Sequence, residues 1–229
     1  SEPYNLLCPD IPIIINDELN KRKAVTGCVA TAMAQIIRYW QYPNQTSAIT
    51  GYDLNFTSGE NTYTVEVPSW NPTTLDWANM LPSYNGNESD AQKNAVATLL
   101  ALCGTSVNMK YNTGASSASS SSVPGALKDY FGYDLAAKEI FRLNYRAAEW
   151  NQIIYDELKD KRPVMYSGLS TGGGHSFVVD GYDSDDYFHV NWGWGGYQDN
   201  YFLLSVLDPE ANAGIGASSS SDGYGYGQS

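Results

Sequence analysis

The sequence has 229 residues, of which 42% are hydrophobic, and this suffices for the core of one large domain or two small ones. The 25 acidic residues outnumber the 13 basic ones, and the net charge of −12 argues against a nucleic-acid-binding protein, because an acidic surface repels phosphate backbones. No segment is apolar for long enough to cross a bilayer, so we expect no membrane partner.

The first strong pattern along the chain is helical. Apolar residues recur at helical spacing at Val29, Met33, Ile36, Ile37 and Trp40. They predict a helix over about 27–42, which Pro43 ends. Farther along, the alternation in NTYTVEVPSW (61–70) predicts a strand, and residues 76–81 predict a short helical turn.

Three further helices are predicted in the middle of the chain. Ser89 is a typical N-cap for a helix that we expect Gly104 to end. The Ser-rich segment 113–125 predicts a flexible loop, near the end of which Pro124 can open the next helix. Residues 149–161 carry a fourth, amphipathic pattern.

The pattern changes after Pro163. Short runs of β-branched and aromatic residues alternate with Gly and Asp turns, which predicts an antiparallel sheet formed by residues 163–170, 175–183, 187–194 and 200–207. The Gly- and Ser-rich tail, residues 212–229, is predicted to be a loop. A helical N-terminal half followed by a mostly β C-terminal half makes the predicted fold class α+β.

The three cysteines are Cys8, Cys28 and Cys103. Their odd number excludes a full disulfide framework and leaves at least one free thiol. With only two histidines and no ligand pair at metal spacing, the sequence predicts no metal site and no cofactor. Cys103 lies on the apolar face of its helix and is interpreted as a core residue, whereas no role is assigned to Cys8.

Cys28 is the strongest candidate for a reactive group. The predicted helix places it in the first turn, where main-chain N–H groups and the helix dipole favour a thiolate, the nucleophilic form of cysteine. Gly27, just before it, lets the backbone and a substrate approach closely. The alternative is that Cys28 is a small buried hydrophobic residue, which is the usual fate of a free cysteine.

His175 follows three glycines and opens a predicted strand, so it can face an open cleft as a general base. Asn191 follows on the next predicted strand, where its side-chain oxygen could accept the ring N–H, and Trp192 and Trp194 could shield that bond from water. The alternatives are a surface histidine in a turn and a hairpin with packed tryptophans. The other histidine, His189, is interpreted as structural.

Taken together, the segments resemble the streptopain family of secreted bacterial cysteine peptidases, which belongs to the papain-like clan. The matching stretches follow the same order over nearly the whole chain: EPYNLL, TGCVATAMAQIIRYWQYP, ESDAQKNAVATLL, ALKDYFGYD and GGGHSFVVDGYDSDDYFHVNWGWGGYQDNYFLL. TGCVATA and HVNWGWGG are the specific motifs among them.

The resemblance implies residue roles. Cys28 matches the nucleophile, His175 the general base, and Asn191 and Trp192 the residues that orient and shield the histidine. Substrate-contacting positions match Ser117, Gly174 and Trp194, which would make the Ser-rich segment one wall of the cleft. The tail matches a mobile loop near the active site.

The resemblance also implies a fold and a biology. We expect a papain-like arrangement of two subdomains, a helical half and an antiparallel β half with the active-site cleft between them, in one catalytic domain over 1–229. Expected substrates are proteins and peptides, with an apolar residue two positions before the scissile bond. A secreted zymogen inhibited by its own pro-segment is implied, and the chain is expected to be the mature form, trimmed at its C-terminus.

One family feature is not matched. Papain-like enzymes complete the oxyanion hole with a glutamine, whose expected position falls just upstream of Ser1, and Gln35 lies too far into its helix to replace it. Two alternatives to an active peptidase stay open: a binding or adhesion module on a decayed peptidase fold, which the acidic, Tyr-rich composition would suit, and an inhibited form with a filled cleft.

Overall fold

The computed structural model describes residues 2–16, 18–58, 61–170 and 173–207, so the predicted C-terminal loop lies outside the described residues. The chain divides into two compact units, residues 1–138 and 139–229, and each is described by itself. Within the described residues, no helix has the length and hydrophobicity needed to span a membrane. Helices and antiparallel sheets together confirm the predicted α+β class.

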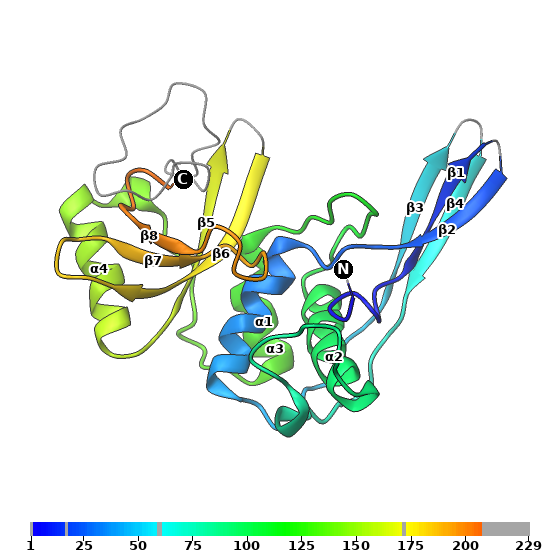
Figure 1. The fold of residues 1–229 in the computed structure, drawn as a ribbon, viewed down its shortest axis with the longest axis horizontal. Helices are drawn as coiled ribbons and strands as arrows, with labels where there is room; N and C mark the ends of the chain where they lie inside the picture. The colour runs from blue at the N-terminus through cyan, green and yellow to red at the C-terminus, as the bar shows by residue number, and fades with distance from the viewer. Residues whose placement is uncertain (1, 17, 59–60, 171–172, 208–229) are drawn as a thin grey trace. The chain divides into compact units, whose positions relative to one another are not determined.

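In its described residues, the first unit contains three α-helices, two short 3₁₀ helices and two hairpins. Its elements in chain order are β1 (Asp10–Ile15), β2 (Glu18–Lys23), α1 (Cys28–Trp40), β3 (Tyr52–Ser58), β4 (Asn61–Val67), the 3₁₀ helix η1 (Trp77–Asn79), α2 (Asp90–Ser106), the 3₁₀ helix η2 (Ser120–Ser122) and α3 (Val123–Phe131). The hairpins β1–β2 and β3–β4 lie side by side (Figure 1). Of these four strands only β4 was predicted. The strand β2, ELNKRK, gives no sequence signal, because it has no alternation of apolar and polar residues.

Helix α1 follows the predicted pattern closely. It begins at Cys28, ends at Trp40, and buries its apolar face, including Val29, Met33 and Ile37, against the first unit's core, in which it packs on α2. Gln41 then takes a left-handed conformation, with φ of 46°, and its N–H bonds to the Arg38 carbonyl, which closes the helix before Pro43.

Helix α2 begins as predicted but ends later. The Ser89 hydroxyl accepts the Gln92 N–H while the Gln92 side chain accepts the Ser89 N–H, a reciprocal capping box. Gly104 was expected to end the helix, and this was wrong, since α2 continues to Ser106. The glycine is needed for space: a Cβ at Gly104 would lie 2.0 Å from the hydroxyl of the buried Tyr111.

Where the structure describes it, the second unit forms a four-stranded antiparallel sheet with an α-helix packed on it. Its elements are the 3₁₀ helix η3 (Arg142–Asn144), α4 (Ala147–Lys159), β5 (Val164–Ser170), β6 (Gly173–Tyr182), β7 (Phe188–Asn191) and β8 (Asn200–Phe202). The sheet order is β5-β6-β7-β8, which confirms the predicted antiparallel sheet, although β7 and β8 are shorter than predicted.

Helix α4 belongs to this second unit, so the change of architecture lies before the helix and not at Pro163 (Figure 1). Trp150, Ile154 and Leu158, one helical turn apart, are buried in the core formed with the sheet. The Trp150 indole N–H also donates to the Tyr166 hydroxyl at 3.0 Å. The helix thereby covers the face of the sheet that carries Phe177.

The two helical glycines of the first unit make a matched test of this packing. We expect Gly104→Ala to lower the free energy of unfolding by roughly 1–3 kcal/mol, because the added methyl group meets Tyr111. Gly125→Ala in α3 meets nothing within 4 Å and should raise it by about 0.5–1 kcal/mol. Urea denaturation measures both values. Equal stability of Gly104→Ala and the parent chain would show that Tyr111 moves aside freely.

Candidate active site

Cys28 is the first residue of α1, as predicted, and its side chain is partly exposed. The hydrogen-bonded ladder of the helix begins with the bond from the Thr31 N–H to the Gly27 carbonyl. The N–H groups of the first turn come before Thr31, so the helix itself offers them no carbonyl acceptor. These N–H groups and the helix dipole create a positive potential at the start of α1. The thiol therefore sits where a negative charge on sulfur, or on a nearby oxygen, is stabilised.

Gly27 sets the approach of the chain to Cys28. Its φ of 84° and ψ of 143° lie in a region that residues with a Cβ rarely adopt. A Cβ at this position would also lie 2.7 Å from the Met109 sulfur and 3.0 Å from the Ser116 carbonyl oxygen. Both the backbone angle and the space require glycine.

The start of the Ser-rich segment is fastened next to this helix end. Ser117 exchanges two main-chain hydrogen bonds with Lys110, and the Ser116 hydroxyl donates to the Val25 carbonyl at 2.6 Å. The prediction of a flexible loop over 113–125 is therefore corrected, since its first part is held by these bonds and its last part forms η2 and the start of α3. Ser117 itself is exposed on the same unit as Cys28.

The other two cysteines are buried thiols. Cys8 is 3% exposed, and burial raises the pKa of its thiol to about 11. Cys103 is fully buried in α2, as predicted for a core residue, and burial raises the pKa of its thiol as well. Both thiols therefore stay protonated at neutral pH, which leaves Cys28 as the only partly exposed thiol of the three.

His175 lies on β6 in the second unit, where it pairs with Gly168 of β5. Its Nε2 atom is 2.9 Å from the main-chain carbonyl oxygen of Trp192. A carbonyl oxygen only accepts hydrogen bonds, so Nε2 carries the proton. In the neutral ring the lone pair is then on Nδ1, which is the atom able to take up a proton.

Two opposing effects act on the His175 pKa. Burial lowers it, because the charged imidazolium loses its hydration, and the Trp192 carbonyl raises it by accepting the ring N–H. Burial is the larger effect, and the pKa lies below its ordinary value. The lowered pKa consequently favours, at neutral pH, the neutral form of the ring that a general base requires.

Asn191, the last residue of β7, acts on the same peptide group. Its side-chain oxygen accepts the Gly193 N–H at 3.0 Å. That N–H and the Trp192 carbonyl belong to one peptide unit, so Asn191 orients the carbonyl that contacts His175. The acceptor at Nε2 is thus a main-chain group, which the sequence does not reveal, and the direct contact from the Asn191 amide to the ring stays a prediction.

Two tryptophans stand beside the imidazole. Trp192 is fully buried, with its ring centroid 6.2 Å from that of His175, whereas Trp194 is 41% exposed at 5.0 Å. The two indoles stack on each other at 5.8 Å. Gly174, the third predicted substrate-contacting residue, is exposed next to His175 on β6. Five predicted residues therefore gather within the second unit, and Cys28 and Ser117 within the first.

Asp199 belongs to the same site and was missed by the sequence analysis. Its carboxylate accepts the Trp192 N–H at 2.9 Å, and burial raises its pKa, with the Trp192 N–H acting in the opposite direction. The residue lies inside the HVNWGWGGYQDN stretch. An acidic residue that closes a Gly-rich loop in such a motif was the available signal.

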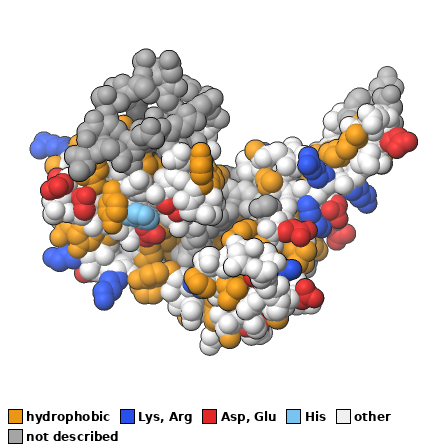
Figure 2. Space-filling view, in the orientation of Figure 1, with side chains coloured by type: hydrophobic (Ala, Val, Ile, Leu, Met, Phe, Trp, Pro, Cys, Tyr) orange, Lys and Arg blue, Asp and Glu red, His pale blue; other side chains and the backbone are white. Residues whose placement is uncertain are grey.

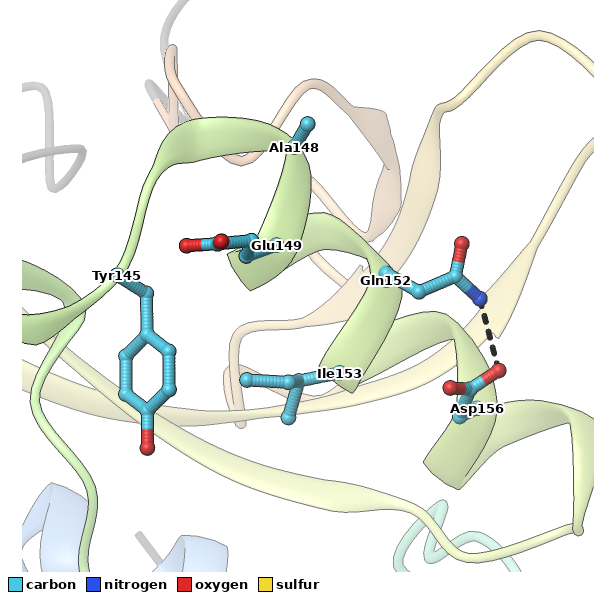
Figure 3. A pocket seen from close by; sticks show the side chains of 6 residues that line it. All are labelled: Tyr145, Ala148, Glu149, Gln152, Ile153 and Asp156. Carbon is cyan, nitrogen blue, oxygen red and sulfur yellow. Dashed lines mark hydrogen bonds between the residues drawn. The ribbon is translucent and has the colours of Figure 1, made fainter.

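The other surface features lack comparable chemistry. A shallow concavity lies on the face of α4 that points away from the sheet, and none of the predicted residues contributes to it (Figure 3). It is lined by Tyr145, Ala148, Glu149, Gln152, Ile153 and Asp156. Across the described residues, no group of three or more acidic, Cys or His side chains is placed to hold a metal. On the face in Figure 2, basic and acidic side chains are interspersed.

Gly27→Ala tests the close approach at Cys28. We expect the free energy of unfolding to fall by more than the roughly 1–3 kcal/mol of backbone strain alone, because the methyl group also meets Met109. Gly86→Ala is the matched control, since Gly86 also has a positive φ, 96°, but open space around it. Urea denaturation compares the two. Equal losses of stability in the two variants would mean that contact of the added methyl group with Met109 does not destabilise the Gly27→Ala chain.

Comparison with known proteins finds relatives that match residues of both units. The model of the peptidase C10 family matches residues 1–202. Streptopain from Streptococcus pyogenes (serotype M28, strain MGAS6180) is 40% identical over 229 residues, covering 97% of this chain and 56% of streptopain. The thiol protease/hemagglutinin PrtT of Porphyromonas gingivalis is 34% identical over 215 residues, covering 94% of this chain and 23% of PrtT.

Among solved structures, active wild-type interpain A cysteine protease from Prevotella intermedia superposes with a TM-score of 0.77 at 35% identity, over 91% of this chain and 83% of that one. A prointerpain A fragment gives 0.72 at 35% identity, over 88% and 61%. These likenesses confirm the papain-like fold. The chain spans 56% of the length of the streptopain relatives that it matches. By its family match over both units, this chain belongs to the peptidase C10 family.

Proposed function

We propose that this chain is the catalytic domain, residues 1–229, of a secreted cysteine endopeptidase that hydrolyses peptide bonds in proteins. The observation that carries the proposal is the family match over residues 1–202, which includes both Cys28 and His175. The local geometry supports the same roles, with a thiol at the start of a helix and an imidazole whose Nδ1 is its basic atom.

The reaction is an acyl transfer in two halves. His175 takes the thiol proton at Nδ1, and the Cys28 sulfur attacks the substrate carbonyl carbon. The Cys28 N–H at the start of α1 donates to the oxyanion that forms. The tetrahedral adduct collapses to a thioester as the C–N bond breaks, and His175 returns its proton to the leaving amine. Water, deprotonated by His175, then hydrolyses the thioester and restores the thiol.

The remaining residues position the reactants. Asn191 orients the peptide unit that binds His175, and Trp192 and Trp194 keep water from the imidazole. Ser117 and Gly174 contribute main-chain groups that bind the substrate. Loss of one oxyanion-hole donor lowers the rate by about 100- to 1000-fold in related chemistry, so the Cys28 N–H is expected to make a substantial contribution to the rate.

The proposal extends to specificity and regulation. An apolar residue is preferred two positions before the scissile bond, within otherwise broad cleavage, and the protein's own pro-segment inhibits it. The solved prointerpain A fragment supports a pro-form for that relative.

Substitution of the two reactive residues tests the mechanism. Cys28→Ala should reduce casein cleavage by at least about 1000-fold, because no other group can form the thioester, and His175→Ala should approach the same loss. His189→Ala is the matched control and should retain activity, since His189 bonds to Asp180 on the sheet. Substantial cleavage by Cys28→Ala would rule out this nucleophile.

Thiol labelling tests the assignment independently of turnover. An epoxide selective for papain-like thiols should modify Cys28 alone in the folded chain, because burial keeps Cys8 and Cys103 protonated and inaccessible. In urea, a general alkylating reagent should modify all three, as peptide mass mapping can verify. Failure of the folded chain to label at Cys28 would favour a binding module or a blocked site.

A further inference from the structure

The loop of residues 192–199, which joins β7 to β8, carries the carbonyl that contacts His175. It has no regular structure, and four of its residues have positive φ: Gly193, Gly195, Gly196 and Gln198. A segment with so many glycines has many alternative conformations, because glycine adopts left- and right-handed backbone angles with similar ease. Its shape therefore depends on the bonds that hold it.

Those bonds converge on Trp192. Its N–H donates to the Asp199 carboxylate at 2.9 Å, and its indole N–H donates to the Gln198 carbonyl at 3.1 Å. The following peptide unit donates its N–H to Asn191 and accepts from His175 through its carbonyl. The peptide units on both sides of Trp192 are thus held, one by Asp199 and the other by Asn191.

We propose that Asp199 is a positioning residue for His175: by accepting the Trp192 N–H, it closes the loop and keeps the Trp192 carbonyl on the Nε2–H of the imidazole. The inference rests on the proposed role of His175 as the general base. Asp199 touches neither substrate nor thiol in this scheme. It acts by keeping Nε2 protonated, so that the lone pair stays on Nδ1.

Asp183 offers a matched control on the same sheet. Its carboxylate also accepts main-chain N–H groups, from Asp185 and Tyr187, in the turn that precedes β7, whereas Asp199 acts in the loop that follows β7. A general loss of sheet stability should follow from removing either carboxylate. An effect on His175 should follow only from removing Asp199.

The first measurement is the Nε2-bound proton of His175, observed by NMR with ¹⁵N-labelled histidine. The chain contains two histidines, so a His189→Ala spectrum assigns the signals. The full chain is used in a Cys28→Ala background, which prevents self-cleavage and makes the result independent of activity. We expect this proton to exchange slowly with water, and Asp199→Ala to accelerate its exchange by at least about tenfold, as expected when a supporting hydrogen bond is lost.

Two further variants separate the hydrogen-bond acceptor at residue 199 from the negative charge of its carboxylate. Asp199→Asn keeps a side-chain oxygen in place and should preserve the slow exchange. Asp199→Glu keeps the charge but displaces the oxygen by one methylene group, and should accelerate exchange as Asp199→Ala does; it also serves if Asp199→Ala does not fold. Asp183→Ala should leave the exchange unchanged.

The second measurement is turnover of a peptide substrate with Cys28 present. Asp199→Ala and Asp199→Glu should lower kcat by about 10- to 100-fold with little change in KM, and Asp199→Asn should restore most of it. Unchanged exchange and kcat in both Asp199→Ala and Asp199→Glu would overturn the inference, as would equal effects from Asp183→Ala. If no variant, including the parent chain, cleaves peptides, the proposed function fails, while the exchange rates still decide whether Asp199 holds His175.

Discussion

The hydrogen bond from His175 Nε2 to the Trp192 carbonyl determines what the second unit can do chemically. It fixes the tautomer of the imidazole, and so decides which nitrogen can act as a base. The sheet sets the His175 backbone, since β6 lies between β5 and β7, and the loop after β7 sets the carbonyl. Trp150, Phe177 and Trp192 belong to one buried hydrophobic cluster, which packs against both the sheet and the start of the loop.

In the first unit, the packing fixes the Cys28 thiol at the start of helix α1. Helix α1 is held by its buried apolar face. The residue before it is Gly27, whose backbone angles and close neighbours both exclude a Cβ. Met109 and the Ser116 carbonyl occupy that space because the segment 110–117 is bonded back onto the strand-to-helix connection. The position of Cys28 thus depends on contacts that Gly27 and Val25 make with residues 109–116, about eighty residues farther along the chain.

Gly27 and Gly104 show why a rule based on neighbouring residues can miss what a glycine does in the folded chain. Gly27 was expected to let the backbone and a substrate approach closely; the structure shows Met109 and the Ser116 carbonyl close to it, and the approach of a substrate stays a prediction. Gly104 was expected to end a helix, but it lies inside α2 because the buried Tyr111 needs the room. Both glycines serve packing against residues distant in sequence, and helix-end statistics contain no information about such neighbours.

The sequence by itself determined the elements whose signals are local: the 3.6-residue period of α1, the Ser89 cap of α2, and the β-branched runs of the sheet. It also placed Cys28 in a first turn, because a helix start is read from neighbouring residues. Only the tertiary structure decided that β2 is a strand, since its polar residues are held by pairing with β1. It alone assigned a main-chain carbonyl to His175 and a carboxylate to the Trp192 N–H. Main-chain groups are identical at every position, so which of them meets a given side chain is set by how the loop folds.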